Sequence, residues 1–214
     1  MNITWCPVRL ISDDPELLDV VPNLCRDLQI VDFQSFSDLE QVQIQKTALA
    51  QILLFDLNKG CTDAECDEEM SFALKRNPRD IVLGIGAGFP GSIIAQLARR
   101  GMFGLIDRPV RNAPFSKAML EANEQCVKLR MEQSELRMLS MQRHSFTKGE
   151  EEVLELVVQG VPNKYIATKL EVSQRTIESR RQKIYQKMNA KRLTDLIRAI
   201  DKLEFLSRTL SQFA

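Results

Sequence analysis

Residues 146–196 constrain the fold of this chain more tightly than any other stretch, because helix-start and helix-stop signals follow one another there at short intervals. Thr147 stands three residues before Glu150, directly ahead of an apolar run, and this capping-box pattern begins a helix. Gly160 closes that first segment, because glycine readily adopts the left-handed backbone that ends a helix. The spacing therefore predicts a short, well-capped helix at the start of a small all-α domain.

Two more short helices follow after tight turns. Pro162 and Asn163 predict a turn and an N-cap ahead of a helix over residues 164–170. Ser173 predicts the N-cap of a third helix that continues to about Met188. Helices this short are stable only when they pack on one another, so the three together predict a helix-turn-helix arrangement.

The second and third helical segments are strongly basic, since residues 164–192 contain nine Lys or Arg against two Glu. Outward positions on the first turns of a recognition helix meet base edges in the major groove, whereas flanking cations meet phosphates. The residues expected to face bases are Gln174, Arg175, Glu178, Ser179 and Gln182. Those expected to contact phosphates are Lys164, Arg181, Lys183, Lys187 and Lys191. The pattern predicts contact with double-stranded DNA, and a basic helix pair that contacts only protein is the alternative.

The chain as a whole has no net charge, but its charge is unevenly distributed. Residues 144–214 hold thirteen basic and nine acidic side chains, whereas residues 1–143 hold sixteen and twenty. Such a division is expected when one end of a protein meets a polyanion. The charge distribution therefore agrees with DNA contact by the C-terminal region.

Three motifs in this region occur in the order found in a known family. They are Glu150-x-Glu152-Val153-Leu154, Gly160-x-Pro162-Asn163-Lys164-x-Ile166-Ala167 and Ser173-x-Arg175-Thr176-Ile177-Glu178. They resemble the LuxR/FixJ/NarL helix-turn-helix, and most closely its FixJ branch. The resemblance implies that Thr176 also faces DNA and that a fourth helix, over about residues 193–203, pairs two copies on DNA. Ser173, at the start of the recognition helix, belongs to the same DNA-binding set. Arg180 departs from the family, which usually has His at this position.

The first half of the chain shows short apolar runs that alternate with helical patterns. Strands are predicted at residues 8–11, 30–33, 52–55, 81–85 and 105–106, and the intervening helices include one that opens at residues 37–40 and others over 68–76 and 92–100. This alternation predicts a flavodoxin-like α/β domain with a five-stranded parallel sheet and right-handed crossovers. Functional groups in such sheets lie beyond the carboxyl ends of the strands.

The carboxyl ends of the predicted strands carry Ser12, Asp13, Asp14, Asp56, Gly86 and Arg108. Their order and spacing, over about residues 7–125, resemble the receiver domain of bacterial response regulators. The resemblance implies that Asp56 is the phosphoacceptor and that Asp13 is the second acid of the receiver site. In the same alignment Ser12, Gly86 and Arg108 replace the first acid, the hydroxyl residue and the lysine of the family.

These replacements change the chemistry that the site supports. Asp13 and Asp56 still offer carboxylates for Mg²⁺, together with backbone and water oxygens. Gly86 has no hydroxyl to report a phosphoryl group, and Arg108 is permanently charged and can pair with Asp56 without phosphate. Two interpretations stay open: conventional phosphorylation switching, or a receiver fold used as a fixed or differently regulated dimerisation and sensing module. Asp13 and Asp14 are alternatively solvated loop carboxylates that cap the next helix.

Residues 114–143 predict one long helix, because they contain no glycine and, after Pro114, no proline. Apolar side chains follow alternating four and three spacings at Phe115, Met119, Ala122, Cys126, Leu129 and Leu136. This seam either pairs two chains as a short coiled coil, or its first half packs on the receiver-like sheet. The predicted organisation is a receiver-like domain over residues 1–125, a linker helix over 126–143 and an all-α helix-turn-helix domain over 144–214.

The cysteine and histidine content argues against several chemistries. Five cysteines without a Cys-x-x-Cys pair, and a single histidine, do not supply the usual ligands of structural zinc. No set of nucleophile, base and orienting group is apparent, so no enzyme is expected. The sequence shows no leader pattern and no apolar run near the roughly 20 residues that a spanning helix needs, so we expect a cytoplasmic location without membrane contact.

Together these features predict a homodimeric transcription regulator of two-component type that binds specific DNA sequences and carries an atypical receiver. A sensor kinase and RNA polymerase are candidate partners. The alternative is an interaction protein, in which the receiver-like domain binds a protein partner and the basic domain contacts the transcription machinery.

Overall fold

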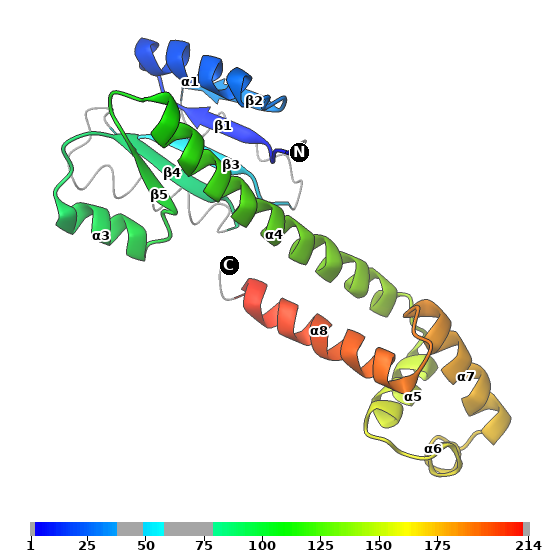
Figure 1. Cartoon of the computed structure of the whole chain (residues 1–214). Helices are drawn as coiled ribbons and strands as arrows, with labels where there is room; N and C mark the ends of the chain where they lie inside the picture. The colour runs from blue at the N-terminus through cyan, green and yellow to red at the C-terminus, as the bar shows by residue number, and fades with distance from the viewer. Residues whose placement is uncertain (1–2, 38–48, 58–78, 212–214) are drawn as a thin grey trace. The chain divides into compact units, whose positions relative to one another are not determined.

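The computed structural model describes residues 3–37, 49–57 and 79–211 of the chain (Figure 1). Two predicted helices lie wholly or mostly outside the described residues, namely the one that opens at residues 37–40 and the one over 68–76. The segment 59–62, which follows the third strand, also lies outside them. The chain forms two compact units, which divide between Met131 and Glu132. We call them the N-terminal unit and the C-terminal unit and describe each separately.

The N-terminal unit is built on a five-stranded parallel sheet with the strand order β2-β1-β3-β4-β5. The strands are β1 (Val8–Ile11), β2 (Phe33–Phe36), β3 (Ile52–Asp56), β4 (Ile81–Gly86) and β5 (Gly104–Asp107). The described helices of this unit are α1 (Pro15–Asp27), α3 (Gly91–Arg99) and the first part of α4 (Asn112–His144). The predicted parallel α/β sheet is thereby confirmed, with its central strands β3 and β4 buried along their whole length.

Two apolar clusters cover the two faces of this sheet. On one face, α1 and α4 pack on alternate strand residues such as Leu10 and Leu54. On the other, Leu97 of α3 packs with Leu53 and Val82. Because a parallel sheet covered on both faces exposes little side-chain surface, its strands are nearly continuous apolar runs, which is why β3 and β4 could be predicted from the sequence.

The second strand begins three residues later than predicted. Gln29 has a φ of 61°, and its N–H donates to the carbonyl of Arg26 while the N–H of Ile30 donates to the carbonyl of Cys25, both at 2.9 Å. This pair of hydrogen bonds is a Schellman motif that ends α1, and Ile30 is the apolar residue that packs behind it. The prediction of a strand over residues 30–33 was therefore wrong, because the apolar run belongs to a helix C-terminus and β2 is a half-exposed edge strand.

The long helix α4 confirms the helix predicted over residues 114–143. The first part of its apolar seam packs on the receiver-like sheet, which was one of the two interpretations. Phe115, Met119, Ala122 and Cys126 are completely buried against the receiver-like sheet. Each large apolar side chain buried in this way stabilises the unit by about 1.5–3 kcal/mol. These four positions are therefore core residues of the N-terminal unit, and a coiled coil through them was the wrong interpretation.

The C-terminal unit contains the end of α4 and four further helices: α5 (Lys148–Val158), α6 (Asn163–Lys169), α7 (Gln174–Lys187) and α8 (Leu193–Ser211). The capping box at the start of α5 is present, with the Glu150 carboxylate 2.9 Å from the Thr147 amide nitrogen. Glu171, with a φ of 54°, makes the tight turn between α6 and α7. Helix α8 continues to Ser211, past the end predicted at about residue 203, and Leu206 is buried in it.

Candidate receiver site and DNA-binding surface

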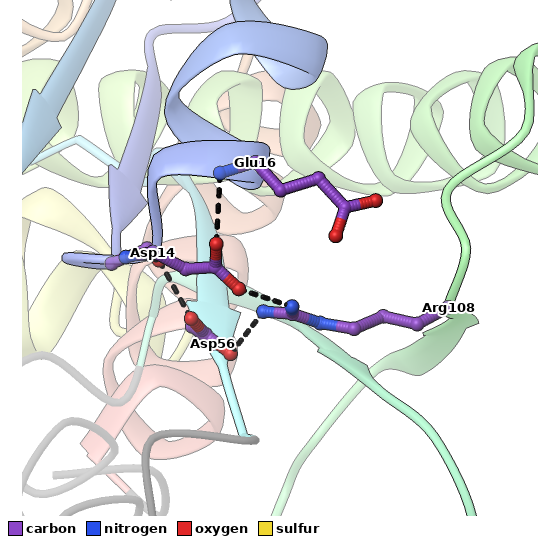
Figure 2. Close-up of polar contacts among 5 residues, drawn as sticks. Asp14, Glu16, Asp56 and Arg108 are labelled. Carbon is purple, nitrogen blue, oxygen red and sulfur yellow. Dashed lines mark hydrogen bonds and ion pairs between the residues drawn. The ribbon is translucent and has the colours of Figure 1, made fainter.

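The carboxyl edge of the sheet brings together side chains from three segments of the chain. Asp14 follows β1, Asp56 ends β3 and Arg108 follows β5, and Figure 2 shows the three side chains converging. Parallel strands end at the same edge, so residues far apart in the sequence meet there. The structure thus assembles the predicted receiver site, although with an arginine at its centre.

Asp56 is buried, with 3% of the residue exposed, and both of its carboxylate oxygens accept strong hydrogen bonds. The Ser12 hydroxyl donates to Oδ2 at 2.6 Å, and Nη2 of Arg108 donates to Oδ1 at 2.7 Å. A buried carboxylate is stable in its charged form only when such donors replace the lost water. Ser12, which stands where the resemblance to receiver domains places an acid, is therefore a donor to the Asp56 carboxylate.

Arg108 joins two carboxylates at once. Its Nη1 donates to Oδ2 of Asp14, while Oδ1 of Asp14 accepts from the Glu16 amide at 2.8 Å and so caps α1 (Figure 2). The hydrogen bond from Arg108, followed by that from the Glu16 amide, lowers the pKa of Asp14. Burial by itself lowers the pKa of the Arg108 guanidinium, but the hydrogen bond to Asp14 and the charge of Asp56 outweigh it, so the pKa is raised. The ion pair between Arg108 and Asp14 thus stabilises the charged forms of both groups.

The residues proposed for magnesium do not fit the ion in this arrangement. Asp13 is exposed, whereas both oxygens of Asp56 already accept from Ser12 and Arg108. A guanidinium 2.7 Å from Oδ1 places a positive charge where a divalent cation would sit. Gly86 is buried and offers its carbonyl to the amide of Arg108 at 3.1 Å, but it has no hydroxyl. The metal assignment therefore does not fit these residues as they are arranged, and the phosphoacceptor assignment stays a prediction.

The predicted DNA-facing residues lie on α6, on α7 and its N-cap, and, for Lys191, in the segment between α7 and α8. The Ser173 hydroxyl caps α7 by accepting from the Thr176 amide at 3.1 Å, and the two hydroxyls lie 2.8 Å apart. Ile177 and Ile184 are fully buried, so they turn the opposite face of α7 outward. The exposed candidates are Lys164, Ser173, Gln174, Arg175, Glu178, Ser179, Gln182, Lys183 and Lys191.

Arg181 is committed to a contact within this unit. Its Nη1 donates to the Asn163 side-chain oxygen at 2.6 Å, and its guanidinium lies 5.9 Å from the centre of the Tyr185 ring. Pro162 occupies the N-cap of α6 and makes no side-chain capping bond, so the N-cap predicted at Asn163 was wrong. Asn163 is instead the first helical residue, and its side chain attaches α6 to α7 by accepting from Arg181.

Lys187 is also engaged inside the unit. Its ammonium nitrogen lies 2.7 Å from a carboxylate oxygen of Glu150, 2.6 Å from the carbonyl oxygen of Ser145 and 5.8 Å from the centre of the Phe146 ring. Burial alone raises the pKa of Glu150, but the hydrogen bond from Lys187 outweighs it, so the pKa is lowered. A phosphate contact by Lys187 stays a prediction, and it would compete with this ion pair.

Arg180 has a structural partner that the sequence did not reveal. Its Nη1 lies 3.4 Å from the carbonyl oxygen of Gly149, in the first turn of α5. A Cβ atom at residue 149 would lie 2.7 Å from the guanidinium carbon of Arg180, closer than such atoms normally approach. The arginine and the glycine therefore fit as a pair that packs α7 on α5.

A receiver-like parallel sheet followed by a helix-turn-helix unit with an exposed basic face is the architecture of a response regulator with a LuxR-type DNA-binding domain. Residues 144–200 match the family of bacterial regulatory proteins called the luxR family, and this segment belongs to it. The match confirms the family suggested by the three motifs of this region.

Similar proteins are themselves regulators. The transcriptional regulatory protein FixJ of Rhizobium meliloti is 31% identical over 125 residues, which cover 58% of this chain and 60% of FixJ. The response regulator protein TodT of Pseudomonas putida is 22% identical over 207 residues, covering 92% of this chain and 86% of TodT.

The fold of nearly the whole chain also has a solved counterpart. The structure of the response regulator StyR superposes with a TM-score of 0.74 at 20% identity, covering 93% of this chain and all of that one. At this identity the likeness establishes the fold. It confirms the predicted combination of a receiver-like domain and a helix-turn-helix domain. Among the described residues, no helix is long and apolar enough to cross a membrane.

Proposed function

We propose that this protein is a DNA-binding transcription regulator of two-component type whose receiver-like domain is held in one state by Arg108 rather than switched by phosphate. Two findings in the same segment support DNA binding. The luxR-family match covers residues 144–200, and the exposed basic face of α6 and α7 lies within that segment.

The exposed face has the composition of a surface that reads DNA. Lys164, Lys183 and Lys191 are exposed cations that can release counterions from the phosphate backbone. Glu178, Ser179 and Gln182 stand among them on α7 and offer donors and acceptors to base edges. We assign affinity to the cations and specificity to the three polar residues.

A fluorescence anisotropy titration of the full chain with labelled duplex DNA, repeated over a range of salt concentrations, tests this assignment. We expect the affinity to fall steeply as salt rises, because each phosphate contact adds to the slope. Lys164→Ala should reduce that slope, whereas Lys128→Ala, an equal charge loss at an exposed position of α4, should not. Binding that is absent or independent of salt would favour the alternative function as a protein-interaction module.

The second part of the proposal rests on Arg108. Its guanidinium donates a hydrogen bond to Oδ1 of Asp56, and the Ser12 hydroxyl donates one to Oδ2. A phosphoryl donor would need to displace the hydrogen bond at whichever oxygen it attacks, and the product would find no hydroxyl at Gly86. We therefore expect regulation through the amount of protein or through a partner that binds the receiver-like domain.

Intact-mass spectrometry after incubation with acetyl phosphate and Mg²⁺ tests this second part. The natural chain should stay unmodified, while Arg108→Lys with Ser12→Asp, which brings back the lysine and the first acid of the family, should gain a phosphoryl group that Asp56→Asn removes. Arg111→Lys, on an exposed arginine nearby in the sequence, is the matched control. A natural chain that is rapidly phosphorylated at Asp56 would refute the proposal.

The remaining assignments follow from the same function. We expect a homodimer on DNA that is paired through α8, which exposes 65% of Phe205. RNA polymerase and a sensor kinase are the expected protein partners, the expected location is the cytoplasm, and no enzymatic activity is expected. Analytical ultracentrifugation with and without DNA, applied to the chain and to Phe205→Ser, tests the role of α8.

A further inference from the structure

A second cluster of polar and reactive groups lies at the edge of the sheet opposite to Asp56. Cys6, Gln51 and Asp80 each stand just before a strand, so they gather at the amino ends of β1, β3 and β4. The Asp80 carboxylate accepts from the Gln51 backbone amide at 3.1 Å and from its side-chain amide at 3.0 Å. Helix α4 passes this edge and brings Cys126 into the same cluster. The function proposed above uses none of these groups.

Cys6 and Cys126 are direct neighbours although 120 positions separate them. Both are free, buried thiols of the same apolar cluster, and each thiol affects the pKa of the other. Asn123, one helical turn before Cys126, accepts from the Cys6 amide at 2.8 Å and donates to the Thr4 carbonyl at 3.1 Å. The segment that carries Cys6 is thus fastened to the face of α4 that carries Cys126.

The two thiols are chemically unequal. The hydrogen bond from Cys126 lowers the pKa of Cys6 against the opposing effect of burial, and the charge of Arg130 lowers it further. The same hydrogen bond and burial raise the pKa of Cys126. Arg130 is held in place because its Nη1 donates to the carbonyl of Ala50 at 2.7 Å. Since a thiolate is the reactive form of cysteine, Cys6 is the nucleophile of the pair and Cys126 its partner.

We propose that Cys6 and Cys126 are an oxidisable thiol pair that forms an intramolecular disulfide when the protein meets a peroxide. The Cys6 thiolate attacks one oxygen of hydrogen peroxide, so an S–O bond forms while the O–O bond breaks, and the hydroxide that leaves takes up a proton to become water. The Cys126 sulfur then attacks the Cys6 sulfur, forming the S–S bond. The S–O bond breaks, and the second oxygen leaves as water with the Cys126 proton. Two electrons pass from the thiols to the peroxide.

The position of Cys6 in the chain gives an oxidant access to a buried sulfur. The short segment ahead of β1 has no regular secondary structure, and its residues Ile3 and Thr4 are exposed. Exposed segments without regular secondary structure open locally at a lower cost than global unfolding. Cys25 provides the contrast, because it is buried in the last turn of α1 and burial raises its pKa to about 12.

The disulfide would join the chain ahead of the first strand to the helix that leaves the domain. It would close a loop of about 120 residues, and long loops restrict the unfolded chain most. We expect the midpoint of thermal unfolding of the N-terminal unit to rise by roughly 5–10 °C on oxidation and to return on reduction.

Peptide mapping of the full-length chain tests the proposal directly. Cys61 and Cys66, which lie outside the described residues, are first replaced by serine so that three cysteines remain. After treatment of the folded protein with hydrogen peroxide and digestion without reductant, we expect one dominant cross-linked species, between the peptides of Cys6 and Cys126. Cys25→Ser, the matched control, should leave it unchanged, whereas Cys6→Ser and Cys126→Ser should each abolish it.

Alkylation kinetics keep the test decisive even if a variant folds poorly. In the folded chain with all three cysteines, iodoacetamide should label Cys6 at least tenfold faster than Cys126 or Cys25. Failure to form the Cys6–Cys126 species, its formation only after denaturation, or pairing of Cys25 with equal yield would overturn the proposal. DNA affinity is not the readout, so the result is independent of the DNA-binding function.

Discussion

The receiver site and the DNA-binding surface use charge in opposite ways. At the carboxyl edge of the sheet, Arg108 forms ion pairs with Asp14 and Asp56, and 2% of the Asp56 side chain is exposed. On α6 and α7, Lys164 and Lys183 are exposed to solvent. Charges that satisfy one another stabilise a fold and set a fixed state, whereas exposed charges of one sign remain available to a partner.

The same distinction divides the basic residues of the C-terminal unit. Arg181 and Lys187, which were both predicted to contact phosphates, bond Asn163 and Glu150 within the unit. Their neighbours in sequence on α7, Gln182 and Lys183, are exposed. A basic residue on a recognition helix is thus not by itself evidence of DNA contact, because its position around the helix decides whether it serves the fold or the ligand.

The largest effect should come from removing the guanidinium of the receiver site. Arg108→Met removes a charged donor from the buried Asp56 carboxylate and also deprives Asp14 of its ion pair, so we expect the N-terminal unit to lose about 3 kcal/mol of unfolding free energy at neutral pH. Urea unfolding followed by far-ultraviolet circular dichroism measures this loss. Adding Asp56→Leu should recover most of it, since the uncompensated charge is then gone. A single variant as stable as the natural chain would show that the charges are not committed to the fold.

Asp80 is a second buried carboxylate, which accepts hydrogen bonds from the amides of Gln51, and it can be compared with Asp56. Burial raises the pKa of Asp80 to about 6, against the hydrogen bonds from Gln51. The folded chain therefore binds more protons than the unfolded chain between about pH 4 and pH 6, so stability falls as the pH rises through that window. Asp80→Asn should remove this pH dependence and stabilise the unit by about 2 kcal/mol at pH 7. Unfolding free energies of both chains at pH 4, 5, 6 and 7 decide the matter. Parallel curves would contradict the assignment.

Much of this comparison was visible in the sequence. The central strands could be predicted because burial on both faces makes residues 52–55 a continuous apolar run, and the pairing of Arg108 with Asp56 followed from where their strands end. The edge strand β2 could not, because its Phe-Gln-Ser-Phe sequence is short and half polar, while the preceding apolar residues close a helix. A local hydrophobic pattern does not predict a strand correctly at the edge of a sheet or next to the end of a helix.

Contacts within the C-terminal unit were missed for a different reason. The partners Glu150 and Lys187 are 37 positions apart, and Gly149 and Arg180 are 31 apart, so no spacing rule joins them. Only the packing of α7 on α5 brings each pair together. The one available signal was that Arg180 stands where the family usually has histidine, and this signal does not identify the partner of the arginine.

A smaller effect separates the two kinds of lysine on α7. Lys187→Met removes the partner of a Glu150 carboxylate whose side chain is 5% exposed, but the lysine itself is 30% exposed, so we expect a loss of about 1–2 kcal/mol. Lys183→Met, at an exposed position of the same helix, should change stability by less than about 0.5 kcal/mol. Thermal unfolding of the two variants side by side tests the division. Equal losses would mean that exposure does not distinguish structural from ligand-binding lysines.

The smallest effect, and the finest test of the exposed surface, lies between adjacent residues of α7. Lys183→Ala should weaken binding to every duplex by a similar factor and lower the salt slope by about one, as expected for a phosphate contact. Gln182→Ala should instead leave the slope unchanged and relax the choice of base at one position, with a discrimination energy of about 1–3 kcal/mol at stake. Selection of bound fragments from a random duplex library, followed by titrations at two salt concentrations, reads both quantities from the same proteins. If the two substitutions shift slope and preference alike, the exposed face of α7 does not divide affinity from specificity, and its polar residues have a role other than reading bases.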